Sequence, residues 1–182
     1  MGDPKRRKKQ YATPLRPWDR ERIDREAELI RKYGLESKKE LWKTETTLRG
    51  FRRQARKLMA ASGKQAEKES QQLLNKLRSL GLVEEDSDIV DILRLNIEDV
   101  LSRRLQSVVY SKGLARSPGE ARQMVIHGHI VVDGRRVNEP SYLISVEEEE
   151  NVDHHPNSPY RERITPEKVK SSRPSEATLG GE

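Results

Sequence analysis

The chain has 182 residues, of which 36% are charged and only 32% are hydrophobic, so one large core that includes the whole chain is excluded. It contains no cysteine, which excludes disulfides, thiolate zinc sites and cysteine nucleophiles. The sequence has neither the long apolar run of a membrane span nor the apolar stretch of a secretory signal. We therefore expect a soluble, cytoplasmic protein without contact to membranes.

The net charge of +6 is distributed unevenly along the chain. Residues 1–60 contain 19 Lys and Arg against 9 Asp and Glu, a net charge of +10, and residues 102–146 contain 7 against 3, a net charge of +4. Residues 61–101 and residues 147–182 each contain 5 against 9, a net charge of −4. Two basic segments separated by a mildly acidic one indicate a polyanionic partner, although such side chains can also simply keep helical surfaces soluble.

The first 18 residues have no helical or strand periodicity. A basic run is followed by prolines and a tryptophan, which indicates an extended arm that is unordered until it meets a partner. The basic run consists of Lys5, Arg6, Arg7, Lys8 and Lys9, and the later residues are Pro14, Pro17 and Trp18.

Residues 19–101 are expected to be helical and poor in apolar residues. Apolar side chains at helical spacing predict a helix over 19–33, which Gly34 is placed to end. A similar apolar face predicts a helix over 65–80, and Gly81 follows it as a stop signal. Because these apolar faces are narrow, the helices must pack against other parts of the chain or a partner as well as against each other.

A long helical stretch is predicted between these two helices. The residues from Ser37 to Glu40 have the pattern of a capping box, in which each side chain bonds the other residue's backbone N–H at a helix start. Gly50 lies inside the stretch and is a candidate break, because glycine weakens a helix interior.

Residues 102–165 are expected to form a compact α+β unit, since 20 of the 48 residues from 99 to 146 are apolar. The spacing of these residues predicts a helix over 100–109. A second helix is opened by a capping-box pattern at Ser117 and ends at Gly128.

Short strands are expected after the second helix. Asp133-Gly134 lies between two β-prone runs and is a strong hairpin signal, because both turn residues need a positive φ. A third strand is expected over 142–144. The acidic residues 147–150 are interpreted as a solvated charge run, and residues from about 166 onward as a flexible tail.

The sequence contains no pattern typical of an enzyme. A phosphate-binding loop needs clustered glycines between a strand and a helix, and none is present. His127 and His129 have no carboxylate cluster or cysteine beside them, and His154 and His155 are adjacent in a low-complexity segment. We therefore expect no metal site, no cofactor and no small-molecule substrate.

Basic residues gather at the joints of the expected α+β unit. A rim of such side chains, beside two helices joined by a short glycine turn, is suited to phosphate contacts. Arg116 and Arg122 lie outside the apolar positions of the second helix, so we expect them to face solvent. The full set is Arg103, Arg104, Lys112, Arg116, Arg122, His127, His129, Arg135 and Arg136.

Several short motifs follow one another in this unit. They are Arg104-Leu105, Gly113-Leu114-Ala115-Arg116-Ser117, Ala121-Arg122-Gln123, Gly128-His129-Ile130-Val131-Val132-Asp133-Gly134, Val137 and Pro140-Ser141. In order and spacing they closely resemble the S4 RNA-binding domain. Two positions depart from its commonest form: Gln106 stands where an aspartate is frequent, and Pro118 stands where an arginine often follows the serine.

Motifs in the first half narrow the resemblance from a shared RNA-binding domain to a single protein family. They are Met1-Gly2-Asp3-Pro4, Lys32-Tyr33-Gly34-Leu35, Lys39-Glu40-Leu41-Trp42-Lys43 and Phe51-Arg52-Arg53-Gln54-Ala55-Arg56, together with Leu105-Gln106-Ser107-Val108-Val109-Tyr110 further on. With the S4 domain, they resemble the archaeal-type family of small-subunit ribosomal protein S4 over roughly residues 1–165. Some bacterial relatives carry N-terminal cysteines for a zinc site, and because this chain has none, no metal is carried over.

We therefore expect an α+β fold with four segments: a basic arm over 1–18, an all-helical region over 19–101, an S4 domain over 102–165 and a flexible tail over 166–182. The S4 domain is expected to contain two packed helices and a short antiparallel sheet. The resemblance implies a ribosome-bound structural protein that is a primary binder of 16S-type ribosomal RNA. It also implies a role in nucleating assembly of the subunit body, contact with neighbouring proteins such as ribosomal protein five, and a contribution to translational accuracy.

The expected RNA-binding residues fall into three groups. The arm contributes Lys5, Arg6, Arg7, Lys8 and Lys9, and the long helical stretch contributes Arg49, Arg52, Arg53 and Arg56. The S4 domain contributes the rim residues given above together with Ser117 and Gln123.

Two other functions fit part of the sequence. An RNA-modifying enzyme can carry an S4 domain, but it needs a separate catalytic domain with an aspartate loop, which the helical half does not offer. A free RNA-binding regulator or stress factor can also carry this domain, but the long basic helical half and the arm argue against a bare RNA-binding module.

Overall fold

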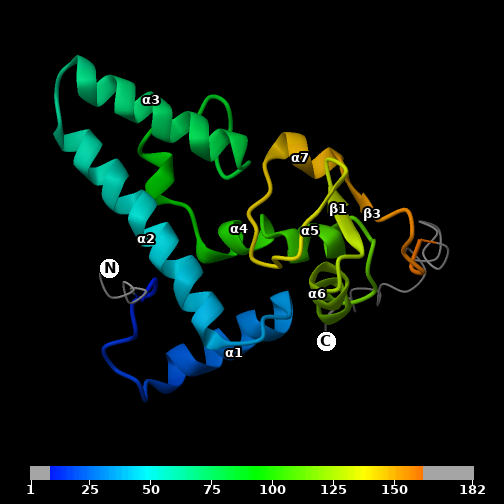
Figure 1. The fold of residues 1–182 in the computed structure, drawn as a ribbon. Coiled ribbons are helices and arrows are strands. Elements are labelled where there is room, and N and C mark those ends of the chain that lie inside the picture. Colours follow the sequence, from blue (N-terminus) through cyan, green and yellow to red (C-terminus); the bar gives the residue numbers. More distant parts are fainter. Residues whose placement is uncertain (1–8, 162–182) are drawn as a thin grey trace, which may run out of the picture.

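A computed structural model describes residues 9–161 of the chain, so the basic residues 5–8 and the expected tail from 166 lie outside the described residues. The fold is α+β, as the sequence predicts: helices make up the first half, and a small three-stranded antiparallel sheet follows in the second (Figure 1). None of the described helices is long and apolar enough to cross a membrane.

Three long helices form the first half. They are α1 (Arg20–Tyr33), α2 (Lys38–Ala60) and α3 (Lys64–Ser79). The predicted ends of α1 and α3 are confirmed, because Gly34 and Gly81 follow them with positive φ angles of 60° and 64°.

Gly50 does not break α2, which contradicts the prediction at this position. The helix runs through it for 23 residues. Leu48 and Ala55 on either side are both buried in one core, and this continuous packing outweighs the cost of about 1 kcal/mol that a glycine imposes on a helix interior.

The predicted capping box at the start of α2 is also absent. Ser37 precedes the helix, but its side chain makes no capping hydrogen bond. The carboxylate of Glu40 is directed to Arg104 and Arg122 instead. Two guanidinium groups bind a carboxylate more strongly than one backbone N–H does, so the long-range ion pairs prevail over the local cap.

The helical half and the α+β unit have separate cores that meet at a small third cluster. The core of the first half includes Leu48, Ala55, Leu58, Leu73, Leu77, Leu82, Ile92, Leu95 and Val100. The core of the second half includes Leu105, Val108, Val109, Ala115, Ala121, Met124, Val125, Ile130, Val132, Ile144 and Val152. Between them lies the cluster of Leu35, Leu41 and Leu101.

The connection after α3 completes the first core. It contains the 3-10 helix η1 (Asp91–Leu93), where Ile92 is fully buried. The connection and α4 (Ile97–Ser102) both lie against α2. They supply the additional packing surface that the helices need, because the apolar faces of the helices are narrow.

The single helix predicted over 100–109 is divided in two. α4 ends at Ser102 and α5 (Leu105–Ser111) begins after Arg104, which has an extended backbone. Arg104 forms an antiparallel bridge with Leu143 there, and the Leu105 N–H donates to the Tyr142 carbonyl at 2.7 Å. This long-range pairing explains why the helix is interrupted.

The sheet has the order β2-β1-β3 and is antiparallel throughout. Its strands are β1 (Ile130–Val132), β2 (Arg135–Arg136) and β3 (Val152–His154). The predicted hairpin is confirmed, since Asp133 and Gly134 connect β1 to β2 with φ angles of 49° and 75°. The helix α6 (Pro118–Ile126) precedes β1, and the Ser117 hydroxyl caps it by accepting the Glu120 N–H.

The third strand is not where the sequence predicts it. Residues 142–144 make only the bridge to Arg104, whereas β3 pairs with β1 ten residues further on. The acidic run between them forms the short helix α7 (Val146–Glu150). Ser145 and Glu148 make a complete capping box there, and this local stabilisation explains why the run is helical.

Candidate nucleic-acid interface

One face of α2 carries a stripe of exposed cations. We define the α2 stripe as Arg49, Arg53, Arg56 and Lys57, which fall within about 100° of arc on a helix of 3.6 residues per turn. Arg49 pairs with the half-buried Glu45 at 2.6 Å. Arg53, Arg56 and Lys57 make no ion pair or hydrogen bond among residues 9–161, so their charges remain available to a polyanion.

Lys57 was missed in the sequence-based set, although its spacing of four residues from Arg53 places it on the same face. Arg52 shows the opposite case. It is half-buried, and its guanidinium donates to the Leu95 carbonyl, so it holds the connection before α4 rather than facing solvent.

Lys9 is the one residue of the predicted basic run within the described part of the chain. It is exposed, and its ammonium lies 4.7 Å from the centre of the Tyr11 ring. Lys5, Arg6, Arg7 and Lys8 lie outside the described residues.

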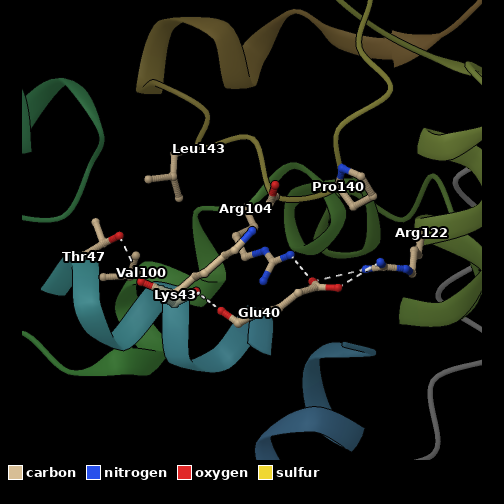
Figure 2. Close-up of a pocket in the computed structure, with 10 residues that line it drawn as sticks. Glu40, Lys43, Thr47, Val100, Arg104, Arg122, Pro140 and Leu143 are labelled. Atoms are coloured by element: carbon tan, nitrogen blue, oxygen red, sulfur yellow. Dashed lines mark hydrogen bonds and ion pairs between the residues drawn. The ribbon is translucent and has the colours of Figure 1, made fainter. Parts of the chain in front are cut away.

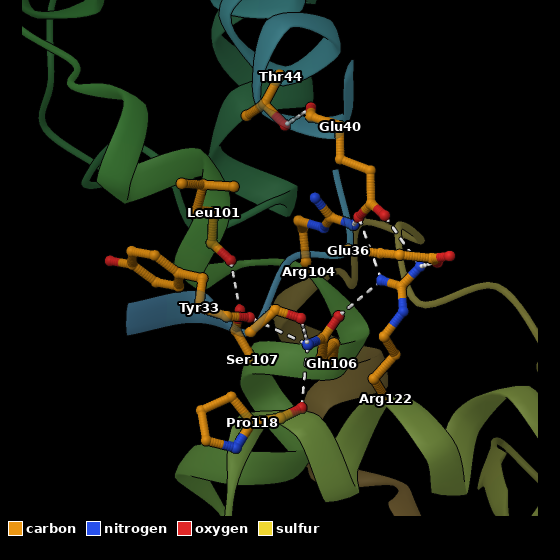
Figure 3. A network of polar contacts seen from close by, with 11 residues as sticks. Tyr33, Glu36, Glu40, Thr44, Leu101, Arg104, Gln106, Ser107, Pro118 and Arg122 are labelled. Carbon is orange, nitrogen blue, oxygen red and sulfur yellow. Dashed lines mark hydrogen bonds and ion pairs between the residues drawn. The ribbon is translucent and has the colours of Figure 1, made fainter. Parts of the chain in front are cut away.

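The junction between the two halves is held by an ion-pair network around Glu40 (Figure 3). Its carboxylate accepts from Arg104 and, at 2.9 Å, from Arg122, which also pairs with Glu36 at 2.7 Å. Burial raises the pKa of Glu40, but the hydrogen bonds from the two arginines outweigh this effect, so its pKa lies below the ordinary value.

The amide of Gln106 completes this network from the other side. Its Nε2 donates to the carbonyls of Tyr33 at 3.0 Å, Gly34 at 2.8 Å and Pro118 at 3.0 Å, and its Oε1 faces Arg122 at 3.4 Å. An ionised aspartate, which is frequent at this position, could not donate to any of the three carbonyls. The departure from the common form therefore has a structural reason.

Several predicted RNA-binding residues are committed to contacts inside the chain. The expectation that Arg122 faces solvent is wrong, because its side chain is only 17% exposed within the junction network. The Arg104 side chain is 3% exposed. Arg103 pairs with Glu149 at 2.6 Å, and Lys112 donates to the Glu150 carbonyl at 3.2 Å. Tertiary contacts, which the sequence does not reveal, occupy these side chains: ion pairs for the three arginines and a hydrogen bond to a backbone carbonyl for Lys112.

A cavity of about 300 Å³ opens beside the junction (Figure 2). Arg104 and Arg122 line it, but both are paired with Glu40, so Lys43 is its exposed cation. The opposite wall comes from the segment before α7, where Pro140 and Leu143 lie. The wall is a mixture of polar and apolar surface with most of its charge neutralised.

A second group of predicted residues gathers at the start of the sheet. The rings of His127 and His129 lie 6.3 Å apart, and His129 meets Tyr160 edge-on at 5.0 Å. Arg136 bonds the ring of His155 at 3.0 Å. His155 could not be assigned from the sequence, because its place beside β1 depends on the pairing of β3.

The remaining predicted residues of the unit are exposed but are not joined by contacts. Arg116, Gln123 and Arg135 face solvent. Ser117 is used as the cap of α6. His154 is buried, and this burial lowers its pKa below the ordinary value. Within residues 9–161, no three His, Asp or Glu side chains are arranged to hold a metal ion.

Comparison with known proteins shows which proteins the sequence of this chain resembles. The S4 domain family matches residues 103–150. A protein of Methanococcus aeolicus named small ribosomal subunit protein uS4 is 50% identical over 177 residues, which cover 97% of this chain and 100% of that protein. Proteins of the same name from Methanococcus vannielii and Methanococcus maripaludis are 53% and 52% identical over 170 residues, covering 93% of this chain and 96% of each relative. The chain therefore belongs to the uS4 family of small-subunit ribosomal proteins.

Proposed function

We propose that this chain is a structural component of the small ribosomal subunit and binds its 16S-type ribosomal RNA. The observation that carries the proposal is the α2 stripe, where Arg53, Arg56 and Lys57 are exposed without a partner among the described residues. Phosphate contacts from such cations supply most of the affinity for RNA. The names and the coverage of the relatives support the ribosomal assignment.

The RNA surface that we propose has two parts. The α2 stripe forms the first, and the exposed cations Arg116, Arg135 and Arg136, with His127 and His129, form the second. The Glu40 network between them sets the orientation of the two halves, so both surfaces meet the RNA in one arrangement. We assign RNA binding to the α2 stripe, to the second surface within the S4 domain over 102–165, and also to the arm over 1–18.

Finer roles belong to the same proposal. We assign to the protein early, primary binding that nucleates assembly of the subunit body, contact with neighbouring proteins such as ribosomal protein five, and a contribution to translational accuracy. Membership of the uS4 family along nearly the whole chain supports a structural role over that of an RNA-modifying enzyme, since the matched relatives are named as small ribosomal subunit proteins.

The test is binding of a 16S-type ribosomal RNA transcript as a function of salt. With about 6–10 phosphates neutralised, affinity should fall by about 10³–10⁵ between 50 and 200 mM salt in a filter-binding titration. The triple variant Arg53→Gln, Arg56→Gln, Lys57→Gln should bind more weakly, and its salt slope should be shallower by about one unit per lost phosphate contact.

A matched control removes the same charge from another place. Lys64→Gln, Lys68→Gln, Arg94→Gln changes three exposed cations in the acidic segment 61–101 and should leave the salt slope close to that of the wild type. A wild-type protein without salt-dependent binding, or two triple variants with equal slopes, contradicts the α2 stripe as an RNA surface.

Sedimentation of a cell lysate distinguishes a ribosomal component from an enzyme or a regulator. A ribosomal component travels with small subunits in near-stoichiometric amount, and an enzyme or regulator stays in the soluble fraction.

A further inference from the structure

Two large apolar side chains stand in solvent on the turn that precedes α1. Leu15 is 100% exposed and Trp18 is 90% exposed, whereas the chain's other tryptophan, Trp42, is half-buried. Scattered apolar residues are common on protein surfaces, so exposure alone indicates nothing. The pair differs from such residues in the way its backbone is held.

A charged side chain from α1 fixes the backbone of this turn. The Arg22 guanidinium donates to the carbonyls of Arg16 at 3.1 Å and Pro17 at 2.9 Å, and its other nitrogen pairs with Glu26. Glu26 is buried, with 6% of its surface exposed. Pro17 restricts the backbone further, because proline fixes φ. The turn is therefore pre-organised and not a loose connection.

Both ends of this segment are tied to α2. Glu26 also accepts the Trp42 indole N–H at 3.0 Å and pairs with Lys38 at 3.3 Å. Upstream, the Tyr11 ring lies 5.9 Å from the Trp42 ring. Figure 1 shows the turn at the outer edge of the helical half, on the side away from the sheet. A rigid backbone that presents an indole to solvent is suited to binding, because little backbone freedom is then lost on association.

The surroundings of the pair indicate what it binds. Arg16 is exposed, and the Arg20 side chain is 95% exposed and lies 3.9 Å from the exposed Asp24 carboxylate. In the sequence, residues 1–18 contain six Lys and Arg against one Asp. A stable protein partner needs about 20–30 residues on each side. The other exposed large apolar residues lie on other elements and do not extend the pair into such a patch; they are Met59, Val90, Tyr110, Ile126 and Val146.

We propose that Leu15 and Trp18 form a stacking site for an unpaired base of the RNA. The Trp18 indole provides the face on which the base stacks, Leu15 provides an apolar contact, and Arg16 and Arg20 meet the flanking phosphates. Bases of single strands and loops are recognised in this way, since every base has a π face that an aromatic ring can cover. This inference rests on the proposed function and adds to it a preference for unpaired nucleotides.

The first experiment compares substitutions of Trp18 in the full chain. Trp18→Ala should lower the affinity for a 16S-type ribosomal RNA transcript by about 5- to 150-fold, the contribution of one stacked base. Trp18→Phe keeps an aromatic face and should retain most of the affinity. Val90→Ala removes an apolar side chain that is 45% exposed from the acidic segment and should bind like the wild type.

The second experiment uses tryptophan fluorescence. Trp42→Phe leaves Trp18 as the single tryptophan, and a melting curve checks that this variant folds. Emission from Trp18 should be readily quenched by acrylamide in the free protein. A 12-nucleotide oligoadenylate should shield it, and an RNA duplex of the same length should not. If Trp42→Phe does not fold, the difference in RNA affinity between Trp18→Ala and Trp18→Phe alone tests whether Trp18 stacks on a base.

The outcomes separate the two proposals. A wild type that binds no RNA overturns the proposed function. A wild type that binds RNA with the same affinity as Trp18→Ala overturns the stacking site alone. Emission that is already shielded in the free protein shows that the chain itself covers Trp18, and shielding by RNA-free small-subunit proteins but not by RNA assigns the site to a protein; either result overturns the inference.

Discussion

At the scale of single residues, the junction of the two halves depends on one carboxylate. The Arg104 side chain is 3% exposed and pairs with Glu40, whose other oxygen binds Arg122. An arginine cannot lose its proton at accessible pH, so a buried guanidinium needs a permanent counter-charge. The same carboxylate is unavailable to cap α2, and Ser37 is left without a side-chain capping bond.

The corresponding prediction is that Glu40→Gln lowers the free energy of unfolding by about 3–5 kcal/mol, because it leaves a buried guanidinium without its charge partner. Glu45→Gln is the matched control on the same helix. Glu45 and its partner Arg49 are 40% and 61% exposed, so its loss should change stability by less than about 1 kcal/mol. Urea unfolding measures both, and equal effects of the two substitutions contradict the structural role of Glu40.

At the scale of elements, the tight connection from α1 to α2 brings both helices against the S4 domain. Gly34 lies in this connection with a φ of 60°, and its carbonyl accepts from Gln106 at 2.8 Å. A Cβ atom here would lie 2.7 Å from the Cβ of Pro118 at the start of α6. Glycine is therefore required both by the backbone angle and by the closeness of α6.

Two glycine substitutions are predicted to have opposite signs. Gly34→Ala should destabilise the fold by at least about 1 kcal/mol, since an alanine strains the left-handed backbone and clashes with Pro118. Gly50→Ala should stabilise it by about 0.5–1 kcal/mol, because Gly50 lies inside α2 and nothing beyond its chain neighbours and the backbone of its own helix lies within 4 Å of the added Cβ. Thermal and urea unfolding of both variants are the measurements. A stabilising Gly34→Ala would falsify the close approach of α6.

At the scale of the whole molecule, charge serves two purposes. Some cations form internal ion pairs that fix the arrangement of the two halves, and others remain exposed and can bind a polyanion. The internal carboxylates Glu26 and Glu40 both have lowered pKa values: burial raises them, but hydrogen bonds from Trp42, Arg22 and Lys38 in the first case, and from the two arginines in the second, outweigh it.

These lowered pKa values predict the pH dependence of stability. A carboxyl group whose pKa is lower in the folded than in the unfolded chain stabilises the fold fully above its unfolded value of about 4.5, and this contribution is lost as pH falls through the folded pKa. Urea unfolding should therefore show a decline in stability below about pH 4.5. Glu40→Gln should have a flatter decline than the wild type, and identical curves contradict the assignment of the acid sensitivity to Glu40.

The sequence by itself determined the features that depend on neighbouring residues. The apolar stripe and Gly34 define α1, the spacing before Gly81 defines α3, and Asp133-Gly134 defines the hairpin, because helix periodicity, left-handed glycine and turn chemistry act within a few residues. The short motifs from Arg104 to Ser141 likewise identified the S4 domain, which the comparison with known families confirms.

Only the tertiary structure decided the features that depend on contacts distant in the chain. The interruption at Arg104, the place of β3 and the continuity of α2 through Gly50 each follow from packing against segments far along the sequence. The same holds for the candidate interface, because the sequence does not distinguish an exposed arginine from a paired one. Arg53 faces solvent, whereas Arg104 faces a buried carboxylate, and both lie in basic motifs. Their surroundings separate them, because a charge removed from water must find a partner, and that partner is brought by the fold.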